Sequence, residues 1–220
     1  MASPFAVWKK LTQLVVMKNF WLIVGSSFVR IMTGFLLGLV CGIILAILSA
    51  RWKIVYKILQ LPMSIVKATP VASFVILALV WISGKRLSTF ISFIMVLPMV
   101  WSAVYTGINC ADIKLFQAAK TFRLSKLQTV EAVYLPAVMP HLLSISQVAL
   151  GFAWKSGIAG EVIAIPKNSI GSQLHNAKVY LETDELFAWT AVIVVLSVII
   201  EKLFSYLMRR ATGKWGSENG

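Results

Sequence analysis

The chain has few charged residues and very few acidic ones. Charged residues make up 13% of its 220 positions, and only 8 Asp and Glu accompany 21 Lys and Arg. A soluble domain carries roughly a quarter of its residues charged. Here 59% of the residues are hydrophobic instead. The composition therefore excludes an ordinary soluble domain and indicates an all-α integral membrane protein, with one domain's worth of length.

Cysteine frameworks and short catalytic motifs are also missing. Cys41 and Cys110 lie in apolar runs and form neither a metal-binding spacing nor a disulfide framework. The sequence contains no G-x-x-x-x-G-K-S/T nucleotide loop, no HExxH, no G-x-S-x-G and no CxxC. We therefore expect no catalytic centre, no metal and no cofactor bound by this chain. If ATP drives the protein, a separate chain must bind it.

The formal net charge is +13. In a soluble protein such a charge would suggest nucleic acid as a partner. In a membrane protein Lys and Arg collect in cytoplasmic loops and orient the spans. The sequence also lacks a basic patch interleaved with aromatic residues, of the kind that binds single strands. We expect a lipid bilayer around the chain and no nucleic acid.

Five segments are apolar for about the length that a membrane span needs. They cover residues 31–50, 68–84, 87–111, 136–161 and 186–207. The first carries Gly34, Gly38 and Gly42, a ladder of small residues that lets another helix approach closely. Pro70 and Pro98 fall in the second and third segments, where proline is tolerated and often marks a kink that shapes a cavity.

The distribution of charge predicts the orientation of these spans. Basic residues follow the first, third and fifth segments, whereas the loop before the fifth holds Glu182, Asp184 and Glu185. The basic side is expected to be the cytoplasm, which places the amino terminus outside. Lys9, Lys10 and Lys18 conflict with that placement.

The first 20 residues show no small-residue cleavage site after an apolar core. We expect an amphipathic interfacial segment there, with a weak sixth crossing near residues 5–24 as the alternative. A transmembrane domain at residues 21–210 and a cytoplasmic tail at 211–220 complete the predicted organisation.

Residues 113–122 have helical spacing in a basic loop between two spans. One stripe holds Leu115, Ala118, Ala119 and Phe122, and Lys114, Gln117 and Thr121 lie on another. A helix this short is not stable alone in water. We expect it to contact a partner surface.

The loop at residues 111–136 resembles the EAA motif of bacterial ABC importer permeases. That motif reads Glu-Ala-Ala, three residues, Gly, nine residues, then Ile-x-Leu-Pro, and this chain keeps both alanines, the Leu-Pro pair and the whole spacing. The loop is similar to the coupling helix that docks in a groove of the ATPase subunit. The resemblance implies coupling roles for Gln117, Ala118, Ala119, Phe122, Arg123, Leu135 and Pro136.

The resemblance extends over roughly residues 25–210, because three further stretches look like the nitrate/sulfonate/taurine permeases. They are LPMSIVKATPVASFVILALVW, FVRIMTGFLLGLVCGIILAIL and GFAWKSGIAGEVIA, and IGSQLHNAKVYLETDELFAW in addition resembles the outer loop of that family. It implies a MetI-like type I importer permease in the bacterial inner membrane, with about five spans, or six. The implied partners are a cytoplasmic ABC ATPase dimer that binds ATP and Mg, a second permease copy and an extracytoplasmic solute-binding protein. The solutes of the family include small anions and other organic molecules.

Two departures from the motif bear on coupling. Gln117 replaces the glutamate, so any salt bridge made by that carboxylate becomes a neutral hydrogen bond. Arg123 replaces the glycine. If that position is left-handed, a non-glycine residue costs roughly 1 kcal/mol there.

Ionisable and aromatic residues near the spans, and the prolines that mark kinks, are the candidates for a solute path. We assign to it Pro70, Pro98, Trp154, Lys155 and Glu161. The alternative for Glu161 is a structural anchor at the interface, paired with Lys155 or hydrogen-bonded to backbone. Lys67 is expected to be an orientation charge rather than a ligand.

Two other function classes fit parts of the pattern. A stand-alone secondary transporter or channel would explain the spans but not the basic helix, and no inverted repeat is evident. A membrane-embedded enzyme would need converging ionisable groups inside the spans, which are nearly empty of them. Binding of an ATPase chain distinguishes the importer permease from both.

Overall fold

The computed structural model describes residues 3–211, without the side chains of residues 209 and 211, and every element in that part is a helix. Most of the predicted tail at 211–220 lies outside the described residues. The elements are α1 (Pro4–Val16), α2 (Lys18–Arg51), α3 (Lys53–Ala68), α4 (Val71–Leu79), α5 (Gly84–Asn109), α6 (Ile113–Thr121), α7 (Lys126–Thr129), the π-helical turn η1 (Val130–Tyr134), α8 (Leu135–Ala164), α9 (Ile170–Val179) and α10 (Thr183–Ala211).

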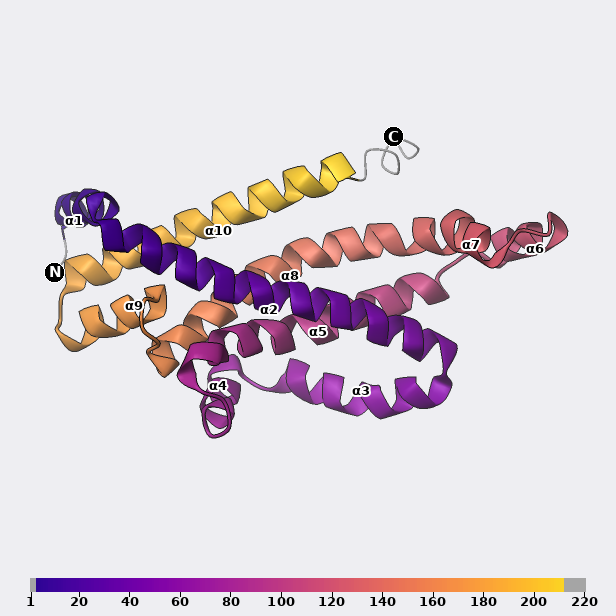
Figure 1. Ribbon diagram of the computed structural model, residues 1–220, viewed down its shortest axis with the longest axis horizontal. Coiled ribbons are helices and arrows are strands. Elements are labelled where there is room, and N and C mark those ends of the chain that lie inside the picture. Colours follow the sequence, from indigo (N-terminus) through magenta and orange to yellow (C-terminus); the bar gives the residue numbers. More distant parts are fainter. Residues whose placement is uncertain (1–2, 212–220) are drawn as a thin grey trace.

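The helices form an elongated bundle with two different ends (Figure 1). Helices α2, α5 and α8 run along its centre and pack against one another. At one end lie α1, α9 and the start of α10, and at the other α6 and α7 project beyond the remaining helices. We call these the outer end and the tip.

Four helical stretches in the described chain are long and apolar enough to cross a membrane. They are α2, α5, the continuous stretch Lys126–Ala164 and α10, and the bent pair α3 and α4 makes a fifth if it counts as one broken span. The all-helical membrane fold with about five spans is therefore confirmed.

The second span differs from the prediction. Residues 68–84 do not form one helix, because α3 ends at Ala68 and the nine-residue α4 begins only at Val71. Thr69 and Pro70 are extended between them, and the two helices are bent by 107°. Proline disfavours helical backbone in the residue before it, which explains the break at Thr69. The longer arm of this pair is α3, which the hydropathy pattern did not mark as a span.

The amino-terminal residues form no separate crossing in the described structure. Helix α1 has 13 residues, fewer than the roughly 20 needed to span a bilayer. The helix is interrupted at Met17, whose backbone is extended, and residues from Lys18 onward belong to α2. Helix α1 packs against α10 and α2 at the outer end.

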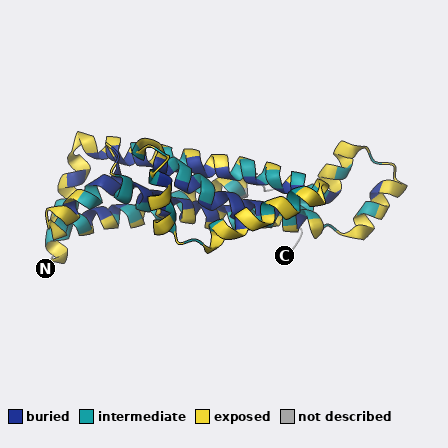
Figure 2. Cartoon of the chain, turned by 90° about the horizontal axis from the view of Figure 1, so that it is seen from below, coloured by how far each residue is buried: buried dark blue, intermediate teal, exposed yellow. Residues whose placement is uncertain are grey.

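The glycine ladder joins α2 to α5, as the sequence predicts. A Cβ added at Gly38 would lie 2.8 Å from the carbonyl oxygen of Phe93, and one at Gly42 would lie 2.8 Å from Cβ of Val100. These close approaches allow the backbones to pack directly. Figure 2 shows the result: buried residues follow the middle of the bundle, whereas its outer faces and the tip are exposed.

Candidate functional site

Helix α6 at the tip is capped at both ends. The Asp112 carboxylate accepts the backbone N–H of Lys114 at 2.8 Å. At the other end Arg123 has φ of 51°, and the N–H of Leu124 reaches the carbonyl of Ala119 at 3.0 Å. This is the Schellman geometry, in which a left-handed residue follows the helix and glycine is preferred. The position that holds Gly in the motif is therefore left-handed here, and Arg123 occupies it.

The tip connects to α8 through an unbroken helical stretch. Ser125 and Gln128 form a capping box at the start of α7. The N–H of Leu135 then bonds to the carbonyl of Val130, five residues back, which makes the π-helical turn. Pro136 follows at the start of α8 and has no N–H to donate, so it favours a widened turn just before it.

The side chains of the tip are largely uncovered. Exposed fractions are 78% for Phe122, 78% for Leu127 and 70% for Ile113. A ring contact at 5.0 Å between Phe116 and Tyr134 holds α6 against the π-helical turn. The basic residues at the tip are exposed as well: Lys114, Lys120, Arg123 and Lys126.

The structure divides the predicted stripe of α6 between two faces. Ala119 is only 6% exposed and faces the rest of the chain, whereas Gln117, Ala118 and Phe122 are exposed. Of the predicted stripe of Leu115, Ala118, Ala119 and Phe122, the chain itself covers Ala119 and leaves the other three exposed. Leu135 and Pro136 are half-buried at the root of α8.

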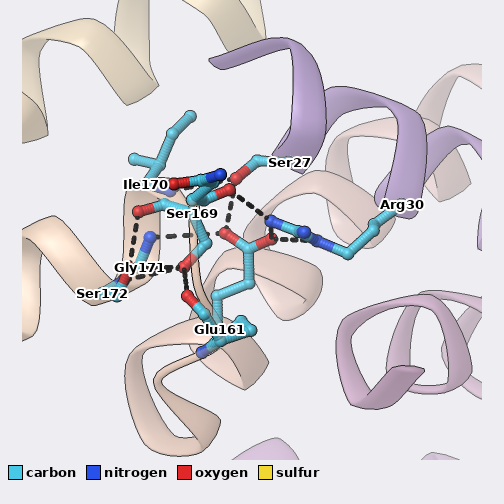
Figure 3. Close-up of polar contacts among 9 residues, drawn as sticks. Ser27, Arg30, Glu161, Ser169, Ile170, Gly171 and Ser172 are labelled. Atoms are coloured by element: carbon cyan, nitrogen blue, oxygen red, sulfur yellow. Dashed lines mark hydrogen bonds and ion pairs between the residues drawn. The ribbon is translucent and has the colours of Figure 1, made fainter. Parts of the chain in front are cut away.

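Glu161 lies at the outer end, fully buried in a polar cluster (Figure 3). Its Oε1 accepts a hydrogen bond from Nε of Arg30 at 3.0 Å and lies 3.0 Å from Nη2 of the same guanidinium. Its Oε2 accepts the Ser27 hydroxyl at 2.7 Å and the Gly171 N–H at 3.3 Å. Every oxygen of the carboxylate is thus hydrogen-bonded, as a buried charge requires.

The same cluster ties four parts of the chain together. Ser27 also accepts the N–H of Ile170, at 2.9 Å, and Arg30 donates to the carbonyl of Asn168 at 2.9 Å. Helix α2, helix α8, the loop after it and the start of α9 therefore meet at Glu161 (Figure 3). We call these residues, Ser27, Arg30, Glu161, Asn168, Ile170 and Gly171, the outer clamp.

The partner of Glu161 was missed from the sequence. Lys155 does not contact it, and Arg30 does, across 131 positions. A signal was present: Arg30 begins the first span, Glu161 ends the fourth, and two spans of opposite direction bring those positions to one membrane level. The backbone hydrogen bond that we considered for Glu161 is present, from Gly171.

The other predicted path residues lie in different surroundings and do not form one site. Trp154 is 1% exposed, and its indole N–H donates to the carbonyl of Ile193 at 3.2 Å, which joins α8 to α10. Lys155 is exposed and takes part in neither of the ion pairs found in the described residues. Pro70 lies in the break between α3 and α4, and Pro98 lines a cavity beside that break.

This cavity, which we call the break cavity, has a volume of about 210 Å³. It lies between the α3–α4 break, α5 and α8 and is partly open to the surroundings. Lys67, Thr69 and Val71 form one side, and the residues opposite include Pro98, Met99 and Phe152.

Comparison with known proteins gives a consistent result. Residues 38–213 match the family described as binding-protein-dependent transport system inner membrane component. The chain is 25% identical over 199 residues to the taurine transport system permease protein TauC of Escherichia coli K12, covering 90% of this chain and 72% of TauC. It is 25% identical over 190 residues to the putative aliphatic sulfonates transport permease protein SsuC of Bacillus subtilis 168, covering 86% and 68%.

A solved structure shares the fold. The inward-facing MetNI methionine ABC transporter superposes with a TM-score of 0.67 at 17% identity, over 96% of this chain and 99% of the matched chain. The MetI-like fold expected from the sequence is therefore confirmed.

Proposed function

The chain belongs to the binding-protein-dependent transport system inner membrane components and is a permease subunit of an ABC importer, and from this premise we propose that its tip is where a separate ATPase drives it. Two copies of the chain, or this chain with a close relative, enclose the solute path. The permease lies in the bacterial inner membrane, and a solute-binding protein delivers the solute at its outer end. ATP and Mg bind to the ATPase and not to this chain.

The single observation that carries this proposal is the exposed apolar surface of the tip. Phe122 and Leu127 are each 78% exposed at the end of the bundle, among exposed basic residues. Burial of such side chains contributes roughly 1.5–3 kcal/mol each. A nine-residue helix held by few contacts also gains order from a partner. A groove with an apolar floor and an acidic rim would complement this surface.

The helical stretch behind the tip supports transmission of movement to the spans. Residues Lys126–Ala164 number 39, which corresponds to roughly 58 Å at 1.5 Å per residue. The tip lies at one end of this rod and the outer clamp at the other. Closure of the ATPase pair would displace α6 and tilt the rod, which biases the bundle between inward-open and outward-open states.

The outer end supports delivery of solute by another protein. Glu182, Asp184 and Glu185 surround the start of α10, and Lys9 and Lys10 of α1 lie across a surface hollow from them. The relatives are named for taurine and for aliphatic sulfonates. We propose small organic anions of this kind as the solute class.

Co-purification tests the coupling role directly. The chain is expressed with candidate ATPase subunits, solubilised gently and isolated, and we expect a stoichiometric ATPase with basal ATP hydrolysis. Phe122→Asp should remove the ATPase, because it forces an unpaired charge into the apolar contact. Leu181→Asp is the matched control, since Leu181 is 83% exposed but lies at the outer end. A chain that purifies alone, or that keeps its ATPase in the Phe122 variant, would contradict the proposal and favour a stand-alone secondary transporter.

A further inference from the structure

The break cavity lies where the bent pair interrupts the bundle. Residue Thr69 has ψ of 129° and Pro70 has ψ of 135°, so the backbone is extended between the two helices. The turn of 107° carries α4 away from the line of α3 and leaves space against α5 and α8. Discontinuous helices at such positions commonly form the solute sites of transporters.

The cavity is remote from both ends of the bundle. Met99 and Pro98 lie near the middle of α5, whose 26 residues run from Gly84 to Asn109. Lys67 is near the end of the 16-residue α3, roughly 21 Å along that helix from its start. Figure 1 shows the break between α3 and α4 well inside the length of the bundle. A solute that crosses between the two ends must pass this level.

Lys67 is the charged residue that lines the cavity. The ion pairs found in the described residues are Lys10–Glu185 and Arg30–Glu161, so no described carboxylate lies within ion-pair distance of Lys67. Lys67 is exposed in the single chain, and an ionisable residue within a membrane span is by default a candidate functional residue. The hydroxyl of Thr69 is already used, since it donates to the carbonyl of Ile65 at 2.8 Å.

The remaining walls of the cavity are apolar. Val71, Met99 and Phe152 offer hydrocarbon, sulfur and an aromatic ring. A volume of about 210 Å³ exceeds the share of several water molecules, at roughly 30 Å³ each. One cation against apolar walls complements a molecule that has a single anionic group and a short apolar body.

We propose that the break cavity is a subsite for a small organic anion such as an alkylsulfonate, with Lys67 binding its anionic group. The inference rests on the proposed function, since the solute must pass through this chain. It transfers the anion-binding role from Lys155, which does not line the cavity, to a residue that the sequence marked only as an orientation charge. The methionine and Phe152 side chains would contact the apolar body of the anion.

Thiol labelling tests the charge selectivity of the cavity in the full chain. Cys41→Ala and Cys110→Ser remove the native thiols, and Thr69→Cys places one thiol in the cavity wall. The chain is reconstituted in vesicles and treated with a sulfonatoethyl or a trimethylammonioethyl methanethiosulfonate, which differ in the sign of their charge. We expect the anionic reagent to react faster, and ethanesulfonate to protect the thiol.

Adding Lys67→Met should lower the ratio of anionic to cationic labelling rates by about fivefold or more, the size expected for one nearby elementary charge. Lys67→Arg should preserve the ratio. Lys57→Met, at an exposed lysine of the same helix outside the cavity, is the matched control and should change nothing. Val71→Cys repeats the measurement in case the Thr69 variant does not fold.

An unchanged ratio in Lys67→Met, or a thiol that neither reagent reaches, would overturn the proposal. Protection by anionic phospholipid in the vesicles, and not by ethanesulfonate, would show a lipid headgroup site and would overturn it too. Because labelling needs no ATPase, its outcome is independent of co-purification. In the intact importer, Lys67→Met should raise the KM for uptake of ethanesulfonate while ATP hydrolysis stays coupled to the chain.

Discussion

The outer clamp and the tip lie at the two ends of one bundle and differ in how far the chain covers their side chains. At the outer clamp Glu161 is fully buried, and partners from α2 and α9 satisfy its carboxylate. At the tip Phe122 is 78% exposed, and α6 contacts the rest of the chain through its neighbour, the π-helical turn. One end is closed by the chain itself, and the other leaves apolar and basic groups uncovered.

The difference shows how a permease subunit can be both rigid and responsive. A bundle that is fixed at the outer end can convert a displacement at the tip into a tilt of the long stretch Lys126–Ala164. If both ends were equally loose, displacement of α6 would be absorbed locally. Variants that loosen the clamp test whether the outer end is fixed by its ion pair. Variants at single residues of the tip test how that end folds and contacts its partner.

The largest effect is expected at the clamp. Arg30→Met leaves the Glu161 carboxylate buried without its cation, and breaking a buried pair in this way typically costs about 3–5 kcal/mol. We expect a markedly lower unfolding temperature in detergent, measured by the fluorescence of the tryptophans. Arg86→Met removes an exposed arginine that is in neither ion pair and is the matched control.

A second variant separates charge from size at the same place. Arg30→Met with Glu161→Gln leaves no uncompensated charge, so it should recover much of the lost stability. If the single and double variants unfold at the same temperature, the ion pair is not what stabilises the outer end.

The two alanines of α6 should respond differently. Ala119 is 6% exposed, so Ala119→Asp buries an unpaired carboxylate and should destabilise the tip by about 1–3 kcal/mol. Ala118 is exposed, so Ala118→Asp should leave folding unchanged and impair only ATPase binding. Amide exchange of α6 reports the first effect, and co-purification reports the second. Equal exchange rates in the two variants would show that α6 is rotated from the orientation described here.

Arg123→Gly should stabilise the turn after α6 modestly. Arg123 has φ of 51°, and glycine relieves a penalty of roughly 1 kcal/mol at such a position. Slower exchange of the Leu124 amide, which closes the turn by bonding to Ala119, would confirm this. ATPase binding should persist, and a sharp loss would show that the guanidinium contacts the partner.

Much of the fold could be predicted because the signals are local. The length of the apolar runs located α2, α5, α8 and α10, and the spacing of small residues marked the face of α2 that meets α5. The helix at the tip followed from periodicity, and the left-handed conformation at Arg123, which the motif raised only as a condition, is present in the structure.

The remainder depends on contacts between distant residues. A continuous apolar run hid the break at Thr69, although Pro70 was visible within it. The partner of Glu161 lies 131 positions away, so proximity in sequence wrongly favoured Lys155. Lys67 lines the break cavity only because four helices meet there, which no single stretch encodes. Candidate path residues were therefore harder to find than spans.

The smallest effect is expected at the salt bridge of α1, which lies at the outer end but on the surface. Lys10 Nζ lies 2.9 Å from Oε2 of Glu185, with side-chain exposures of 34% and 18%. The hydrogen bond to Glu185 raises the pKa of Lys10 above its ordinary value of 10.5, against the opposing effect of burial. Because this pKa is raised on folding, the ion pair contributes its full share to the free energy of unfolding at pH values below the unfolded-state pKa of Lys10. That contribution is lost as the pH rises through the folded-state pKa. Lys10→Met should therefore cost no more than about 1 kcal/mol at neutral pH, and the difference from the unaltered chain should vanish in strongly alkaline buffer. Unfolding measured at both pH values checks this, with Lys9→Met as the control, and a loss as large as that of Arg30→Met would mean that α1 belongs to the clamp.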